Sequence, residues 1–206
     1  MNWNIPNILT LLRLIAAPGV AIMFLYFHRP LADWFALILF VVAAFTDFLD
    51  GYLARAWKQE SKFGAMMDPI ADKAMVIIAL VVITGFSGMN AWILLPAVLI
   101  IFREVFVSGL REFLGETAGL LKVTNLAKWK TTVQMAAISV LFAKGAFEHY
   151  LIDRTNGDVL GLRTLELGAE ISWYLGIGLL WIAMVLTVLS GADYFGKSLP
   201  YLRDAP

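Results

Sequence analysis

The chain has 206 residues, of which 60% are hydrophobic and only 16% are charged, and its mean hydropathy is +0.77. Soluble domains are about half apolar and about a quarter charged, so this composition predicts a membrane protein. Sixteen Lys and Arg balance sixteen Asp and Glu, which gives no sign of nucleic-acid binding. The absence of cysteine excludes disulfides and thiolate chemistry, so we expect any bound metal to be a hard cation held by carboxylates.

Six apolar segments are candidates for membrane-spanning helices, which need roughly 20 mostly apolar residues each. The predicted spans are 5–27, 31–55, 68–86, 91–112, 128–147 and 171–189. Turn-forming residues at 28–30 and 85–88 separate three of them, and we expect 149–170 to be a loop on the outer side. The predicted fold class is therefore an all-α bundle of six transmembrane helices, in one domain over residues 1–206.

Lys and Arg near the ends of the predicted spans indicate the orientation of the chain in the membrane. With the N-terminus inside, the cytoplasmic side carries the larger group, Arg55, Lys58, Lys62, Lys73, Arg111, Lys122, Lys128, Lys130, Lys197 and Arg203. The opposite side carries Arg29, Lys144, Arg154 and Arg163. We therefore expect a multi-pass protein of the cell (inner) membrane with a cytoplasmic N-terminus.

Four aspartates lie on two consecutive spans. Asp47 and Asp50 are three residues apart and share a helix face, and so do Asp68 and Asp72, which are four apart. A charge inside a membrane helix costs about 2.5–3.5 kcal/mol, and like charges at these spacings repel, but a shared cation reverses that repulsion. The alternative is structural ion pairs and caps, with Asp68 as the N-cap before Pro69. Four acids exceed what capping requires, so we predict a metal site.

Small residues and one arginine accompany these acids. Gly51, Ala54 and Gly64 add little bulk, and Gly51 would let a ligand approach the helix backbone closely. Arg55 lies two turns from Asp47 and could contact an aspartate or a phosphate.

The spacing of these eight residues resembles the signature of the CDP-alcohol phosphotransferase family. The segment reads Asp47-Phe-Leu-Asp50-Gly51-Tyr-Leu-Ala54-Arg55, and after eight intervening residues comes Gly64, followed by Asp68 and Asp72. All eight fixed positions are present at the family spacing. Softer matches, at residues 4–13, 103–112, 127–131 and 190–195, resemble the bacterial members that use sn-glycerol 3-phosphate.

The resemblance implies a reaction and a set of site residues. Asp47, Asp50 and Asp68 would be the principal metal ligands, and Asp72 would ligate metal and act as the general base. The cofactor would be Mg²⁺ or Mn²⁺, with two ions, and Gly51, Ala54, Arg55 and Gly64 would bind CDP. The substrates would be CDP-diacylglycerol from the membrane lipid and glycerol 3-phosphate, CMP would leave, and the enzyme would be a homodimer.

A phosphorylated acceptor would also need basic groups near the metal site. The candidates are Arg103, Arg111, Lys128 and Lys130, and Arg103 is deep enough in its span to need a partner or a water-filled cavity. The alternative for the other three is contact with anionic lipid headgroups. Asn7, Thr10 and Arg13 share a helix face, and we expect them to line the same cytoplasmic cavity, with helix anchoring as the alternative. No mechanistic role is predicted for Asp193.

Three other activities remain open from the sequence. The signature does not choose among acceptors, so inositol phosphate, serine or phosphatidylglycerol could replace glycerol 3-phosphate. A membrane prenyltransferase also binds diphosphate through aspartates and magnesium, although such enzymes are larger and lack the pattern of small residues. A carboxylate-lined cation transporter would move metal without releasing CMP.

Overall fold

The computed structural model describes residues 5–56, 61–120, 125–153 and 159–202, with the side chains at 6, 47–56, 116, 118, 120, 125–128, 152–153 and 159–161 outside the description. All the regular secondary structure in this part of the chain is helical, without strands. Its elements are α1 (Ile5–Tyr26), α2 (Leu31–Ala56), α3 (Lys62–Phe86), α4 (Ala91–Leu114), a 3₁₀ helix η1 (Gly115–Leu120), α5 (Asn125–Asp153) and α6 (Val159–Leu202).

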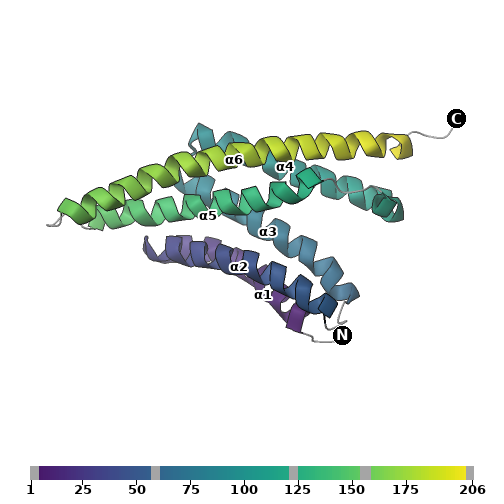
Figure 1. Ribbon diagram of the computed structural model, residues 1–206, viewed down its shortest axis with the longest axis horizontal. Coiled ribbons are helices and arrows are strands. Elements are labelled where there is room, and N and C mark those ends of the chain that lie inside the picture. Colours follow the sequence, from purple (N-terminus) through teal and green to yellow (C-terminus); the bar gives the residue numbers. More distant parts are fainter. Residues whose placement is uncertain (1–4, 57–60, 121–124, 154–158, 203–206) are drawn as a thin grey trace.

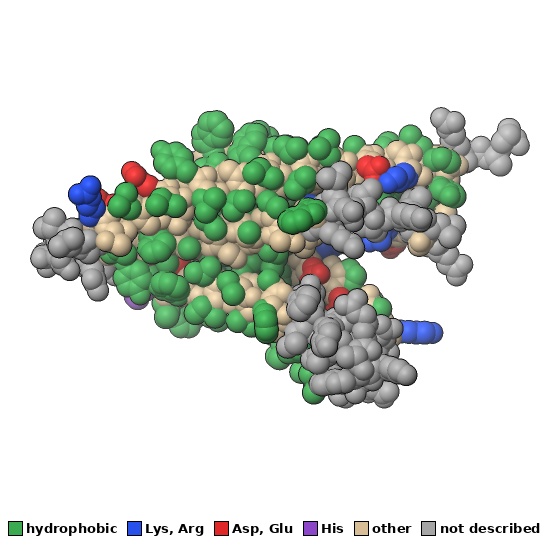
Figure 2. All heavy atoms as spheres, in the orientation of Figure 1, with side chains coloured by type: hydrophobic (Ala, Val, Ile, Leu, Met, Phe, Trp, Pro, Cys, Tyr) green, Lys and Arg blue, Asp and Glu red, His purple; other side chains and the backbone are tan. Residues whose placement is uncertain are grey.

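Four of these helices are long and apolar enough to cross a membrane over the residues described. They are Asn7–Tyr26 of α1, α3, α4 and Leu162–Leu202 of α6, and α2 contributes the shorter apolar stretch Leu31–Thr46. Large apolar side chains such as Leu25, Phe102 and Phe113 are exposed on the outside. Figure 2 shows such side chains spread over the visible face, whereas charged ones gather toward its ends. The prediction of an all-α, polytopic membrane protein is therefore confirmed.

The helices form two groups that meet along α2, α3 and α5. In Figure 1, α5 and α6 run side by side and α4 crosses α6, while α1 packs against α2 and α3. Helices α2 to α6 each contribute at least one large side chain to the core. Examples are Phe40, Leu80, Ile100, Phe142 and Leu180. Fully buried alanines such as Ala17 and Ala36 let the backbones approach closely, as is typical of membrane bundles.

The third helix begins earlier than the sequence suggested, and the alternative role of Asp68 as its N-cap is wrong. Ser61 is the N-cap of α3, and its hydroxyl accepts a hydrogen bond from the Gly64 amide at 3.0 Å. Pro69 therefore lies inside the helix rather than at its first position. Proline is tolerated there because neighbouring helices in a membrane bundle can satisfy the freed backbone groups. As a result, both Asp68 and Asp72 project from a continuous helix.

The predicted loop at 149–170 is also wrong. Helix α5 continues to Asp153 and α6 already begins at Val159, so most of that stretch is helical. At the other end, α6 continues past the predicted end at residue 189 to Leu202. Polar residues indicate the membrane boundary, but they do not end a helix, because the backbone hydrogen bonds of a helix do not depend on whether its side chains are polar.

Candidate functional site

One face of α1 lies against the first half of α3. Asn7, Thr10 and Arg13 are all buried, and they occupy successive turns of α1. Thr10 Oγ1 donates to Asp68 Oδ1 at 2.5 Å, and Arg13 Nη1 donates to Asp72 Oδ1 at 2.9 Å. Arg13 Nη2 also lies 3.6 Å from Asp68 Oδ1. This face of α1 therefore holds the two aspartates of α3 in place.

Gly64 of α3 packs closely against Asn7 of α1. A Cβ atom added at Gly64 would lie 2.7 Å from Asn7 Oδ1 and 3.3 Å from Ser61 Oγ. Ser61 Oγ also donates to Asn7 Oδ1 at 2.8 Å. The absence of a side chain at Gly64 is therefore required by packing in this structure, apart from its predicted role in binding CDP.

The other signature residues lie in the last three turns of α2. Helix α2 includes Asp47, Asp50, Gly51, Ala54 and Arg55, but their side chains lie outside the described part of the structure. Among the side chains that are described, no group of three or more acids or histidines could hold a metal ion. The complete metal group therefore remains a prediction.

The donors that are described fit a hard divalent cation. Asp68 and Asp72 are half-exposed, lie one turn apart on α3, and offer the oxygen ligands that Mg²⁺ and Mn²⁺ prefer. Only residues 57–61 separate α2 from α3, so the ends of these helices lie within about 22 Å of each other. The aspartates of α2 thus lie in the helix that leads directly into the one bearing Asp68 and Asp72.

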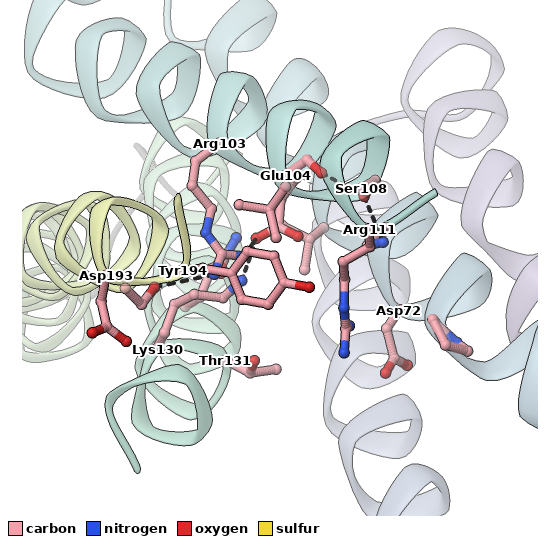
Figure 3. Close-up of a pocket in the computed structure, with 15 residues that line it drawn as sticks. Asp72, Arg103, Glu104, Ser108, Arg111, Lys130, Thr131, Asp193 and Tyr194 are labelled. Atoms are coloured by element: carbon pink, nitrogen blue, oxygen red, sulfur yellow. Dashed lines mark hydrogen bonds and ion pairs between the residues drawn. The ribbon is translucent and has the colours of Figure 1, made fainter. Parts of the chain in front are cut away.

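Next to Asp72, α3, α4, α5 and α6 enclose a cavity of about 270 Å³. Three of the predicted acceptor-binding residues, Arg103, Arg111 and Lys130, line it (Figure 3). The side chain of the fourth, Lys128, lies outside the described part of the chain. The structure thus brings three of the four predicted acceptor-binding residues and one aspartate of the signature to a single cavity, which Lys73 also lines.

Glu104, to which the sequence analysis assigned no role, organises the cations of this cavity. Its buried carboxylate accepts hydrogen bonds from Lys130 Nζ and, at 3.3 Å, from Arg103 Nη1. Arg103 Nη2 also donates to Ser190 Oγ at 3.2 Å, and the Arg103 side chain packs on Gly191. An acid directly after an arginine in mid-span was a signal that could have been used, because an intramembrane cation needs a partner.

Three further residues of the cavity wall were not predicted as site residues. Tyr194, Gln134 and Asp193 line the cavity from α6 and α5. Asp193 Oδ2 accepts a hydrogen bond from Lys197 Nζ at 2.7 Å, and both side chains are partly exposed. Asp193 is therefore the ion-pair partner of Lys197, which lies one turn further along α6. An aromatic and an amide on apolar helices carry no sequence signal that separates a cavity wall from a core.

A second cavity, of about 390 Å³, reaches Asp72 from the side of α2. Its wall is mostly apolar and is formed by α2, α3 and α5, with Arg13 and Asp72 among its polar residues. The apolar part consists of Val41, Ala43, Ala44, Met75, Val76, Met135 and Ala136. Asp72 therefore lies on the wall of both a cationic cavity and an apolar one.

Comparisons with known proteins agree with the signature. A family model described as CDP-alcohol phosphatidyltransferase matches residues 3–189. A protein of Cereibacter sphaeroides named CDP-diacylglycerol–glycerol-3-phosphate 3-phosphatidyltransferase is 63% identical, over 99% of this chain and 99% of its own. Proteins with the same name from Rickettsia bellii and Haemophilus influenzae are 40% and 38% identical. They align with 95% and 99% of this chain, and with 95% and 98% of their own lengths.

Proposed function

Because this chain belongs to the CDP-alcohol phosphatidyltransferase family, we propose that it transfers the phosphatidyl group of CDP-diacylglycerol to sn-glycerol 3-phosphate and releases CMP. The observation that carries this proposal is the position of Asp72, on the wall of both cavities. A reaction between a lipid and a small charged alcohol needs one apolar site and one polar site that meet at the reacting atoms. Family membership favours this chemistry over the prenyltransferase and the cation transporter considered above.

The cationic cavity suits a small phosphorylated acceptor. Its volume of about 270 Å³ is slightly below the ~300 Å³ at which sites for drug-sized ligands begin. A phosphate dianion would find Arg103, Arg111 and Lys130 on its walls, and Glu104 fixes two of these cations before the substrate enters. The acyl chains of a lipid acceptor such as phosphatidylglycerol would exceed this volume, and serine would leave the cations without a phosphate.

Asp72 is the residue we assign as general base. In the proposed step its carboxylate takes the proton of the acceptor hydroxyl, and the acceptor oxygen forms a new bond to the β-phosphorus, the one that carries diacylglycerol. The bond from that phosphorus to the bridging oxygen breaks, and CMP leaves with the electron pair. Arg13 Nη1 donates to Asp72 Oδ1, which fixes the orientation of the carboxylate toward the acceptor.

The metal and nucleotide sites complete the proposal. Asp47, Asp50, Asp68 and Asp72 would hold Mg²⁺ or Mn²⁺, with two ions as the expected number. When bound, these ions would neutralise the diphosphate and polarise the phosphorus under attack. Gly51, Ala54 and Arg55 would receive CDP along α2, together with Gly64 at the start of α3. The diacylglycerol chains would lie toward the apolar cavity between α2, α3 and α5.

The purified protein with CDP-diacylglycerol and a choice of acceptors tests this assignment directly. We expect CMP release with glycerol 3-phosphate, and little or none with inositol phosphate, serine or phosphatidylglycerol. Removal of divalent metal with a chelator should stop CMP release, and added Mg²⁺ or Mn²⁺ should restore it. CMP release with inositol phosphate but not with glycerol 3-phosphate would overturn the assigned acceptor.

We also infer the setting in which the enzyme works. The distribution of basic residues supports insertion in the inner membrane with the cavity facing the cytoplasm, where soluble phosphorylated substrates are available. The family resemblance supports a homodimer. Its mass in lipid nanodiscs would be about twice that of the 22.9 kDa chain, after correction for the lipid and the scaffold.

A further inference from the structure

Besides Arg103 Nε, two buried polar groups in the wall of the cationic cavity, both of them neutral, have no hydrogen-bond partner among the described residues. They are the hydroxyl of Tyr194, whose residue is 8% exposed, and the amide nitrogen of Gln134, which is 2% exposed. Buried polar groups in folded proteins are nearly always hydrogen-bonded, because leaving one unpaired destabilises the fold. Two unpaired groups on one cavity wall therefore indicate a polar ligand that completes them.

The Tyr194 hydroxyl lies between the two ends of the cavity. Figure 3 shows the ring between the side of Arg103 and Lys130 and the side of Arg111 and Asp72, with its hydroxyl directed toward the latter. An acceptor that places its phosphate at Arg103 and Lys130 and its reacting hydroxyl at Asp72 must pass this point. In glycerol 3-phosphate, the group between the phosphate and the reacting hydroxyl is the secondary hydroxyl.

The ring of Tyr194 is held firmly enough to act as a fixed donor. It packs with Val107 and Leu114 in a small hydrophobic cluster at this end of the molecule. The guanidinium of Arg111 lies over the ring, with its carbon 5.7 Å from the ring centroid. These contacts hold the ring from more than one side, and the free torsion of the hydroxyl remains available for a ligand.

We propose that the Tyr194 hydroxyl donates a hydrogen bond to the secondary hydroxyl of the acceptor and thereby selects glycerol 3-phosphate over phosphates that lack this group. The inference rests on the proposed function and adds a specificity-determining residue to it. A neutral donor is suited to this task, because the cations of the cavity already supply the charge for the phosphate. Gln134 is a second neutral group on the same wall.

The experiment compares two acceptors, glycerol 3-phosphate and 3-hydroxypropyl phosphate, which keeps the phosphate and the primary hydroxyl but lacks the secondary one. In the wild-type enzyme, we expect kcat/KM to be about tenfold lower for 3-hydroxypropyl phosphate. Tyr194→Phe should lower kcat/KM for glycerol 3-phosphate about tenfold and leave the value for 3-hydroxypropyl phosphate unchanged. The KM for CDP-diacylglycerol should be the same in the Tyr194→Phe enzyme as in the wild type.

The matched control is Tyr201→Phe, which removes the same atom from a half-exposed tyrosine on the same helix. It should keep the wild-type preference between the two acceptors. Thermal melting without acceptor provides a second readout. Because the Tyr194 hydroxyl is unpaired, Tyr194→Phe should melt no lower than the wild type, whereas loss of a structural hydrogen bond would lower the melting temperature.

Two outcomes would overturn the role of Tyr194 while leaving the proposed function intact. One is an equal loss of kcat/KM on both acceptors, which would place the hydroxyl at the phosphate or at the reacting end. The other is no change on either acceptor. A wild-type enzyme that releases no CMP with glycerol 3-phosphate would instead overturn the proposed function, and the role of Tyr194 with it.

Discussion

Arg13 shows how one residue shapes the proposed active site. Its side chain is almost fully buried, and its two terminal nitrogens face different aspartates of α3, Asp72 at 2.9 Å and Asp68 at 3.6 Å. Two carboxylates one turn apart repel each other, and a planar guanidinium can satisfy both at once. A lysine could offer only a point charge. The arginine therefore keeps the aspartates ordered even without a bound cation.

Asp72→Asn tests the assigned general base by replacing its carboxylate with an amide of the same shape. The amide cannot accept the proton of the acceptor, and general-base catalysis contributes about 10²–10⁴-fold, so kcat should fall at least a hundredfold. The measurement is CMP release at saturating concentrations of both substrates. Glu166→Gln, an exposed acid-to-amide change on α6, is the control and should keep wild-type activity. An Asp72→Asn enzyme with full activity would remove Asp72 as the base.

Residues of the site differ in how far the sequence could identify them. Asn7, Thr10 and Arg13 were grouped from their spacing alone, because helical periodicity is a local property. Glu104 could have been found from the sequence as the partner that an intramembrane Arg103 needs, because it follows Arg103 directly. Tyr194 depends on which helices meet, and a single sequence does not contain that information. From the sequence alone, Tyr194 is predicted to be an ordinary aromatic residue at the membrane interface. Only the arrangement of α4 and α5 beside α6 shows that it lines the cavity.

At the scale of elements, the contact between α1 and α3 depends on the absence of a side chain at Gly64. A Cβ atom there would lie 2.7 Å from Asn7 Oδ1, so Gly64→Ala must push the helices apart or displace Asn7. We expect a loss of about 1–3 kcal/mol in the free energy of unfolding, measured in mixed detergent micelles, together with lower activity. Gly19→Ala on α1, where nothing lies within 4 Å of the added atom, is the control.

The pair Gly64→Ala and Asn7→Ala separates packing from nucleotide binding. If the clash with Asn7 causes the loss of stability, Asn7→Ala should make Gly64→Ala less harmful, and the two changes should be non-additive. If the KM for CDP-diacylglycerol rises equally with and without the Asn7 side chain, Gly64 also contacts the nucleotide. Additive losses of stability would contradict the packing explanation.

A buried ion pair at the other end of the bundle joins the turn between α1 and α2 to α5. Arg29 donates to both carboxylate oxygens of Asp33, and Asp33 is 1% exposed. A Cβ at Gly145 of α5 would collide with Asp33 Oδ1, so the pair fits directly against that helix. The guanidinium of Arg29 also lies over the rings of Phe24 and Phe86. This end of the molecule is thus organised by charge and aromatic packing together.

Asp33→Asn should therefore destabilise the protein without changing its chemistry. It leaves the Arg29 guanidinium, which is only 19% exposed, without its counter-charge, and breaking a buried pair costs about 3–5 kcal/mol. Unfolding in mixed micelles measures this loss, and kcat of the folded enzyme should stay at the wild-type value. Glu148→Gln breaks the exposed pair with Lys144 and should cost less than about 1 kcal/mol. Similar losses for both variants would contradict a structural role for the buried pair.

Element boundaries were predicted least well where helices leave the membrane. The start of α1 and the turns around residues 28–30 and 87–90 were predicted within one or two residues, because apolar composition and turn residues change together there. The helices α5 and α6 extend far beyond their predicted ends, because polar residues signal water but not the end of a helix. Hydropathy thus located the apolar parts of these helices rather than their full lengths.

At the scale of the whole molecule, α6 is longer than a membrane is thick. Its 44 residues correspond to about 66 Å of helix, against about 30 Å of hydrocarbon. Arg163 near its start and Lys197 near its end are both exposed, and roughly 50 Å of helix separates them. The two residues must therefore lie in water on opposite sides if α6 spans the bilayer.

The orientation of the enzyme can be tested with these two positions because the chain contains no cysteine. Arg163→Cys and Lys197→Cys each introduce a single thiol for a membrane-impermeant maleimide. With the proposed orientation, the reagent should label Arg163→Cys in intact spheroplasts and Lys197→Cys in inside-out vesicles. Permeabilised membranes are the control, since both variants should then react. The reverse pattern would place the cationic cavity on the outer side, away from cytoplasmic glycerol 3-phosphate, and labelling of both variants from one side would show that α6 does not cross the membrane.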